Sequence, residues 1–217
     1  MASATPTMSG RGARGGLGHE WAVWLTVTAS ILVGLLLQAV ALGRTETASS
    51  GGVAGVSLSY PARWVPVPVP DATFAAADLN NGGPFGARVS VSEVPVAQLI
   101  QRVSNDREPL ALATSWTLVR GEAIVGYRLL GLREELVQGR PAAVVEYAYL
   151  ADAPGGPASG ALPAVMRATD VLIPVGAQVH LLTFAAQPQE YERLTHAQFP
   201  RPSSTYASVL RSWRLPD

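Results

Sequence analysis

Residues 127–151 read YRLLGLREELVQGRPAAVVEYAYLA, and this stretch decides the fold class. Its centre, Gly139-Arg140-Pro141, consists of residues typical of a turn. In the half that follows, Val145, Tyr147 and Tyr149 alternate with other side chains, so a strand would place all three on one face. The pattern predicts a β-hairpin whose second strand contributes to a hydrophobic core.

A second hairpin is expected immediately downstream. Residues 166–174 and 178–186 are strand-like runs joined by Val175-Gly176-Ala177. A stretch rich in Pro, Gly and Ala, 152–164, separates this hairpin from the first. It is long for a connection between antiparallel strands, and its composition favours a surface loop. Together the four strands predict an antiparallel meander.

A third hairpin is expected upstream, where residues 73–79 and 86–94 flank Asn80-Asn81-Gly82-Gly83. These four residues tolerate positive φ and therefore favour a tight connection. Before this hairpin, the run VPVPVP at 65–70 alternates as a strand would. Its three prolines lack a backbone donor, so the run is expected at a sheet edge or in an extended connection.

The domain is expected to open with a half-buried strand. Val56, Leu58 and Tyr60 alternate with small or polar residues, which is the period of two that such a strand requires. Pro61 would end this strand, and Trp64 would cap the core beside it.

Two regions have helical spacing instead. Apolar residues recur at mixed three and four spacings over 96–118, with a break expected near Pro109. A C-terminal helix is expected over 203–213, where Ser203 or Ser204 can provide the N-cap. Strand runs interrupted by one helical region and closed by a helix indicate an α+β sandwich on a largely antiparallel sheet.

The N-terminal quarter predicts a different kind of element. Between Glu20 and Arg44 lie 23 residues without a formal charge, and at about 1.5 Å per residue they span the roughly 30 Å hydrocarbon layer of a membrane. We expect a transmembrane helix at 21–43. The alternative is a secretory signal cleaved after Ala41, because Ala39-Val40-Ala41 matches a small-residue cleavage pattern. The apolar run exceeds a usual signal core, which favours retention.

The remaining boundaries follow from these elements. Residues 1–20 are expected to form a disordered tail, 44–52 a flexible linker, and 53–217 one globular domain. A short basic tail inside and the domain outside the cytoplasm is the favoured orientation. The expected location is therefore the cell membrane, with a single span and a C-terminal extracytoplasmic domain.

Three parts of the expected globular domain resemble a known family. The opening Ser59-Tyr60-Pro61-Ala62-Arg63-Trp64, the paired strands around Gly139 and the ending Val209-Leu210-Arg211-Ser212-Trp213-Arg214 are similar to PsbP-like and LpqN-like domains over about 53–217. The resemblance implies an α/β/α sandwich and accessory, assembly or binding roles without a shared catalytic residue. The membrane helix and the VPVPVP run depart from the photosystem members, so no photosynthetic role is implied.

The residues themselves offer little chemistry. The chain has no Cys, which excludes disulfides, thiolate nucleophiles and zinc thiolate sites. From Thr45 onward, thirteen Arg face fifteen acids, so no basic footprint for nucleic acid is present. No G-x-S-x-G motif occurs, and the domain has two histidines, His180 and His196, which are expected in a strand and at the surface. Asp78 begins a sequence like a calcium loop, but Val89 stands where a bidentate Glu is needed.

We therefore expect no catalytic, cofactor-binding or metal-binding residue, and no cofactor. The leading hypothesis is a membrane-anchored, non-enzymatic accessory or assembly module whose extracytoplasmic domain binds a protein partner. The alternative is a small-molecule or lipid binding domain, with an apolar pocket lined by Trp116, Tyr147 and Tyr149, although core packing also explains these aromatic residues. A hydrolase with a site near His180 ranks last. The oligomeric state and the identity of the partner stay open.

Overall fold

The computed structural model describes residues 17–43, 45–49, 56–103, 108–152, 162–197 and 203–215. The chain divides into two compact units, Met1–Arg44 and Thr45–Asp217, and each is described by itself. Much of the long loop expected at 152–164 and most of the tail expected at 1–20 lie outside the described residues.

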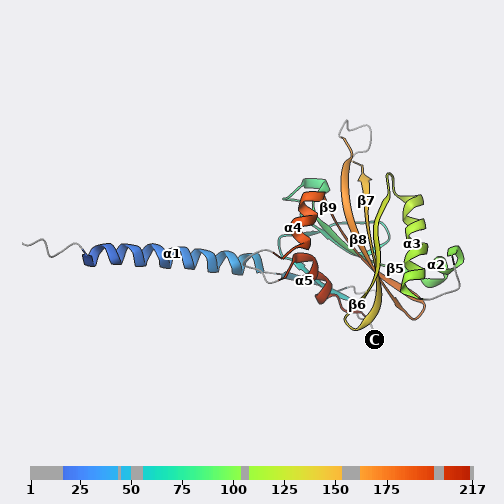
Figure 1. Cartoon of the computed structure of the whole chain (residues 1–217), viewed down its shortest axis with the longest axis horizontal. Coiled ribbons are helices and arrows are strands. Elements are labelled where there is room, and N and C mark those ends of the chain that lie inside the picture. Colours follow the sequence, from blue (N-terminus) through green and yellow to red (C-terminus); the bar gives the residue numbers. More distant parts are fainter. Residues whose placement is uncertain are drawn as a thin grey trace, which may run out of the picture. The chain divides into compact units, whose positions relative to one another are not determined.

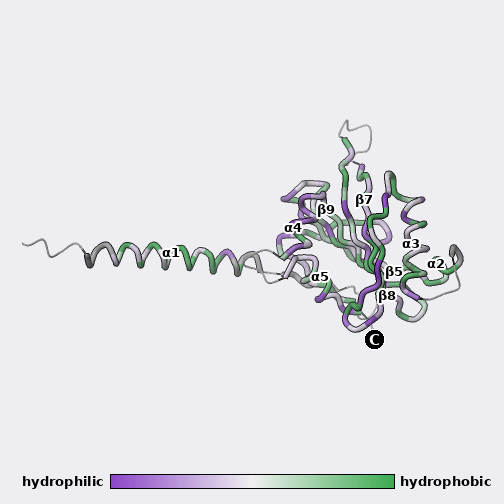
Figure 2. The backbone as a smooth tube through the Cα atoms, in the orientation of Figure 1, coloured by the Kyte–Doolittle hydropathy of each residue, from purple (hydrophilic) through white to green (hydrophobic). Residues whose placement is uncertain are grey.

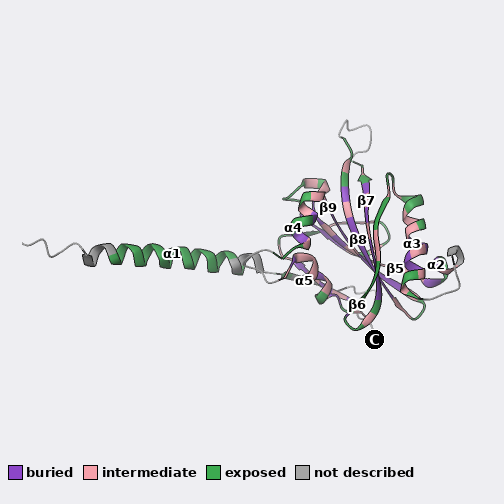
Figure 3. Ribbon diagram, viewed as in Figure 1, coloured by how far each residue is buried: buried purple, intermediate pink, exposed green. Residues whose placement is uncertain are grey.

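The first unit contains helix α1, Leu17–Gly43, of 27 residues. It begins one turn before the expected start at residue 21. Hydrophobic residues recur along α1, and its described side chains are exposed (Figures 2 and 3). Within the described residues it is the one helix long and apolar enough to cross a membrane, a property that signal sequences share.

The second unit is built on a seven-stranded sheet in the order β3-β4-β5-β9-β8-β7-β6, in which every neighbouring pair is antiparallel (Figure 1). The strands are β3 (Val65–Pro66), β4 (Ala72–Ala77), β5 (Arg88–Pro95), β6 (Arg128–Val137), β7 (Arg140–Ala151), β8 (Ala164–Val175) and β9 (Gln178–Ala186). The expected meander is confirmed, since β6, β7, β8 and β9 are neighbours in chain order.

Two helices cover one face of the sheet: α2 (Val96–Val103) and α3 (Pro109–Ala123) (Figure 1). The expected break near Pro109 is confirmed, because this proline occupies the first turn of α3, where its missing N–H costs nothing. Leu112 and Trp116 of α3 join Val145 and Tyr147 of β7 in one hydrophobic core. The predicted common face of β7 therefore points toward α3.

The opposite face is covered by α4 (Pro188–Thr195) and α5 (Thr205–Ser212) (Figure 1). This second core contains Trp64 and Phe184, whose ring centroids lie 6.1 Å apart, together with Trp213 after α5. Each core lies between the sheet and one helix layer, so the α/β/α sandwich is confirmed. A short helix η1 (Gly83–Phe85) lies in the connection between β4 and β5.

The hairpin of β6 and β7 turns one residue earlier than expected. Gln138 and Gly139 have φ values of 54° and 78°, while Arg140 and Pro141 already belong to β7. A two-residue turn of this kind requires positive φ at both central positions. Proline has φ near −65° and cannot occupy either of them.

A small second sheet pairs β1 (Thr45–Ser49) with β2 (Ser57–Pro61). Val56, Leu58 and Tyr60 are buried and alternate as expected. The linker expected at 44–52 differs, because its residues 45–49 form a strand that supplies β2 with an antiparallel neighbour. The VPVPVP run contributes two residues to edge strand β3, in agreement with the expected edge position.

Candidate partner-binding surface

The three aromatic residues proposed for an apolar pocket do come together, around a buried acid. Asp170 of β8 is 0% exposed, and its carboxylate accepts hydrogen bonds from Trp116 Nε1 at 2.6 Å, Thr183 Oγ1 at 2.7 Å, Arg120 Nε at 3.0 Å and Tyr147 Oη at 3.3 Å. The rings of Tyr147 and Tyr149 are in tilted contact, with 5.8 Å between their centroids. All three rings are buried in the hydrophobic core between α3 and the sheet, so core packing explains these aromatic residues.

The charges in this cluster are matched. The Arg120 guanidinium lies 4.5 Å above the Trp116 ring and pairs with Asp170. Burial alone would lower the pKa of Arg120, but the carboxylate of Asp170 raises it above its ordinary value. Burial also raises the pKa of Tyr147, and the charge of Asp170 adds to this effect. Arg120 therefore stays charged and Tyr147 stays neutral at ordinary pH, and the hydrogen bonds of the cluster attach α3 to the sheet.

Neither domain histidine has the surroundings of a catalytic base. His180 of β9 is 3% exposed, and its Nδ1 lies 3.5 Å from Oε1 of Glu93 on the paired strand β5. Burial lowers the pKa of His180 and outweighs the opposite effect of Glu93. His196 lies exposed after α4, with Nδ1 2.8 Å from the carbonyl oxygen of Glu192. Among the described residues, no serine lies within hydrogen-bond distance of either histidine.

The stretch that resembles a calcium loop serves as a connection between strands. Asp78 is 1% exposed and forms an ion pair with Arg63, with Nε 3.1 Å from Oδ2. A Cβ on Gly86 would lie 2.1 Å from the carbonyl oxygen of Asp78, so only glycine allows the chain to return this closely. Within the described ranges, no group of three or more His, Asp or Glu side chains could hold a metal ion.

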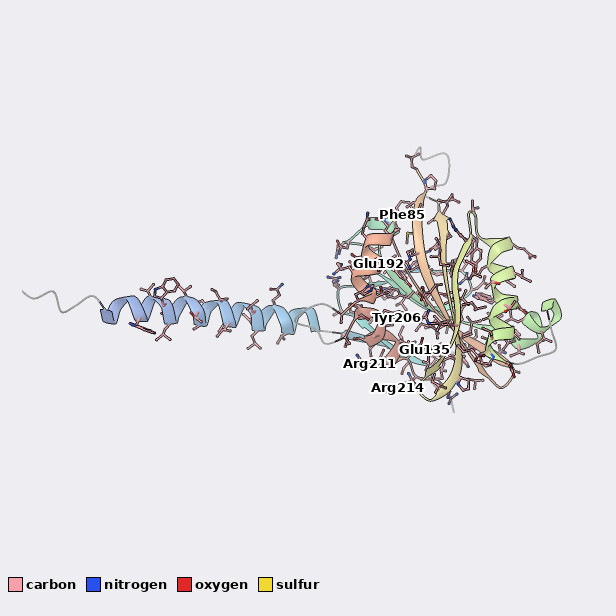
Figure 4. All side chains as sticks on the ribbon, in the orientation of Figure 1. Phe85, Glu135, Glu192, Tyr206, Arg211 and Arg214 are labelled. Atoms are coloured by element: carbon pink, nitrogen blue, oxygen red, sulfur yellow. The ribbon has the colours of Figure 1, made fainter. Side chains whose placement is uncertain are left out.

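A polar cleft of 260 Å³ lies between α4, α5 and the sheet. Figure 4 shows Glu192, Tyr206 and Glu135 on this side of the domain, from α4, α5 and β6. Two ion pairs line it, Arg133 with Glu146 and Arg167 with Glu192. Because each guanidinium already has a carboxylate, the cleft presents little unmatched charge to a ligand.

The most unusual surface is apolar and lies at one end of strands β6, β7 and β8. Three apolar residues there, Val125, Leu150 and Val165, are 65%, 38% and 52% exposed, and we call these three residues the end patch. Leu150 and Val165 are cross-strand partners, and the N–H of Leu150 donates to the carbonyl oxygen of Val125 at 3.0 Å. The ends of β7 and β8 are exposed beyond the helices (Figure 3). Exposed apolar residues that adjoin one another are typical of an interaction surface.

The sequence patterns did not single out the end patch. Each of its residues lies in or beside a strand where an apolar residue is unremarkable. Only the exposure of all three at adjoining positions distinguishes them. The register of three strands is needed to see this.

Comparison with known proteins shows which solved structures have a similar fold. No protein-family model matches the sequence, and no curated protein does. The solved structure of CyanoP, the cyanobacterial PsbP of Synechocystis sp. PCC 6803, is 13% identical, with a TM-score of 0.51 over 79% of this chain and 92% of that chain. LpqN of Mycobacterium tuberculosis, involved in cell envelope biogenesis, is 14% identical, with a TM-score of 0.45 over 80% of this chain and 93% of that chain.

A further similar structure is the Ran-binding protein Mog1p of Saccharomyces cerevisiae, which is 14% identical, with a TM-score of 0.42 over 69% of this chain and 80% of that chain. At these identities the likeness to CyanoP shows the fold alone. The globular unit therefore has a PsbP-like fold, as the resemblance of its opening and ending residues implied.

Proposed function

We propose that this chain is a membrane-anchored, non-enzymatic accessory or assembly module whose extracytoplasmic domain binds a protein partner through the end patch. The observation that carries the proposal is the exposure of three adjoining apolar residues at the ends of neighbouring strands. Removing such apolar surface from water contributes about 25 cal/mol per Å², which offsets part of the entropy lost on association.

The anchor supports this proposal in a second way. Helix α1 would hold the domain at a membrane surface, where a partner in the same membrane meets it at a raised effective concentration. Weak apolar contacts are then sufficient for a specific complex. A module with no evident reaction of its own is well suited to this role.

Affinity purification tests the proposal. The tagged full-length chain is isolated from its native membrane in mild detergent, beside the double variant Val125→Asp with Val165→Asp. Leu79→Asp is the matched control, because Leu79 is 47% exposed but lies in the connection after β4. We expect one membrane protein to accompany the parent chain and the control, and its recovery to fall roughly tenfold with the double variant.

Two results would contradict the proposal. One is that the parent chain recovers no protein above background. The other is that the double variant recovers as much of the partner as the control does. Thermal unfolding of all three proteins verifies that the substitutions act on the surface and not on the fold.

A further inference from the structure

The two edges of the seven-stranded sheet differ sharply. Edge strand β3 has two residues, Val65–Pro66, and two more prolines follow it at Pro68 and Pro70. Prolines lack the donor that a further strand needs, and natural sheets use them to protect an edge. The opposite edge strand, β6, has ten residues and no proline, and no described strand lies beyond it.

The outer side of β6 presents a regular ladder. From Gly131 to Val137 the pairing with β7 runs without a bulge. Counted from the two-residue turn at Gln138-Gly139, alternate residues bond to β7, which leaves Leu132, Glu134 and Leu136 with N–H and C=O groups directed outward. These seven residues would extend over about 23 Å at roughly 3.3 Å each.

The side chains of the same three residues share one face. Leu132 pairs with Val145 and Glu134 with Ala143, and both partners belong to the core beneath α3. Leu136 is 72% exposed, so its side chain is open to a further strand.

Glu134 is an unmatched charge within the regular ladder from Gly131 to Val137. On the other face of β6, Arg133 pairs with Glu135 at 3.7 Å and with Glu146. Glu134 is exposed and forms no ion pair with any described residue. Along this edge, the side chains of Leu132, Glu134 and Leu136 are apolar, acidic and apolar. Each of these residues also directs its backbone N–H and C=O groups outward.

We infer that β6 accepts an extended segment of the partner as an eighth strand, with a basic side chain opposite Glu134 and apolar side chains opposite Leu132 and Leu136. This inference rests on the proposed function and names the kind of segment that the partner supplies. Main-chain hydrogen bonds would give affinity, and the alternate side chains would give specificity.

A second copy of the chain fits this edge less well. The two-fold antiparallel pairing that sets Arg133 opposite Glu135 also sets Glu134 opposite its own copy, and directly opposed like charges are destabilising. The partner segment is therefore expected to come from another protein.

Peptide binding tests the inference without the native partner. The full-length chain in phosphatidylcholine nanodiscs is titrated with the fluorescent peptide TTVTKTVTT, and hydrogen exchange is followed along β6. Two control peptides carry Glu in place of Lys, or N-methyl groups on alternate backbone amides. We expect the Lys peptide to slow exchange in β6, the Glu peptide to bind roughly fivefold more weakly, and the N-methylated peptide to bind at least about tenfold more weakly.

The variant Glu134→Lys supplies the decisive comparison. Because only the sign of one exposed charge changes, the domain is expected to keep its fold, and its preference between the Lys and Glu peptides should reverse. A spin label at Leu136→Cys, unique because the chain has no cysteine, should lose mobility as the Lys peptide binds.

The inference is overturned if no peptide slows exchange in β6, if the N-methylated peptide binds equally well, or if Glu134→Lys leaves the preference unchanged. A short spin–spin distance between the labels of two copies would also overturn it, because it would show that β6 pairs with β6 of a second copy. The two proposals are tested separately. Recovery of a partner through the end patch can fail while the peptide binds β6, and the peptide can fail to bind while the partner is recovered.

Discussion

At the scale of single residues, Asp170 shows how one buried charge can organise a helix and a sheet. Its four donors come from α3, β7 and β9, and Arg120 also covers the Trp116 ring. A buried ion pair contributes little when it is complete, but loss of one partner leaves the other charge uncompensated. The importance of Asp170 is therefore best measured by removing it.

We predict that Asp170→Ala lowers the free energy of unfolding by about 3 kcal/mol, because Arg120 would keep its charge in a mostly enclosed site. Urea unfolding of the full-length chain in detergent measures this loss. Glu192→Ala is the control, since Glu192 is 51% exposed and its ion pair with Arg167 contributes at most about 1 kcal/mol. Equal losses for the two variants would show that Asp170 has no special role.

At the scale of elements, α5 illustrates how far sequence patterns extend. A helix was expected over 203–213 with Ser203 or Ser204 as cap, and the structure selects Ser204, whose Oγ accepts from the N–H of Ala207 at 3.0 Å. Helix α4 was not predicted. It has eight residues, of which only Tyr191 and Leu194 are buried, so its apolar pattern is too short to identify it.

We predict that Ser204→Ala destabilises the domain by about 1 kcal/mol, because the first turn of α5 loses the acceptor for one backbone donor. Thermal unfolding gives the difference. Ser203→Ala is the matched control, and it should cost less because the Ser203 hydroxyl contacts the Ser208 hydroxyl and no backbone donor of the first turn. A larger loss of stability for Ser203→Ala would show that Ser203, and not Ser204, caps α5.

At the scale of the whole molecule, the central question is whether α1 remains attached to the domain. The proposed function requires this, because a cleaved signal would release the domain from the membrane. The described side chains of α1 are exposed, as a helix in lipid would need, but a signal helix shares this property. Length is the feature that favours retention.

We predict that the mature protein keeps its N-terminal helix and stays in the membrane after an alkaline carbonate wash, since an apolar helix of this length inserts stably. Intact-mass measurement of protein from the native membrane provides the direct readout. A mature chain beginning at Leu42 would contradict the prediction. It would also remove the anchor from the proposed function while leaving the end patch and the β6 edge unaffected.

The sequence by itself determined the local structure of this protein. Alternation in Val56, Leu58 and Tyr60, glycine at a turn and proline at an edge act through neighbouring residues, so the strands, the hairpins and the sandwich class could be predicted. The uncharged apolar run between Glu20 and Arg44 likewise predicted the N-terminal helix.

Only the tertiary structure decided which strands become neighbours across long separations. The pairing of β5 with β9 made β6 an edge and brought Glu93 to His180. Asp170 meets Trp116 across 54 positions, and the end patch forms because three strand ends coincide. Such contacts depend on the burial of whole faces, a cooperative property that no short stretch of residues contains. The surfaces that carry the functional proposals were therefore visible only in the folded domain.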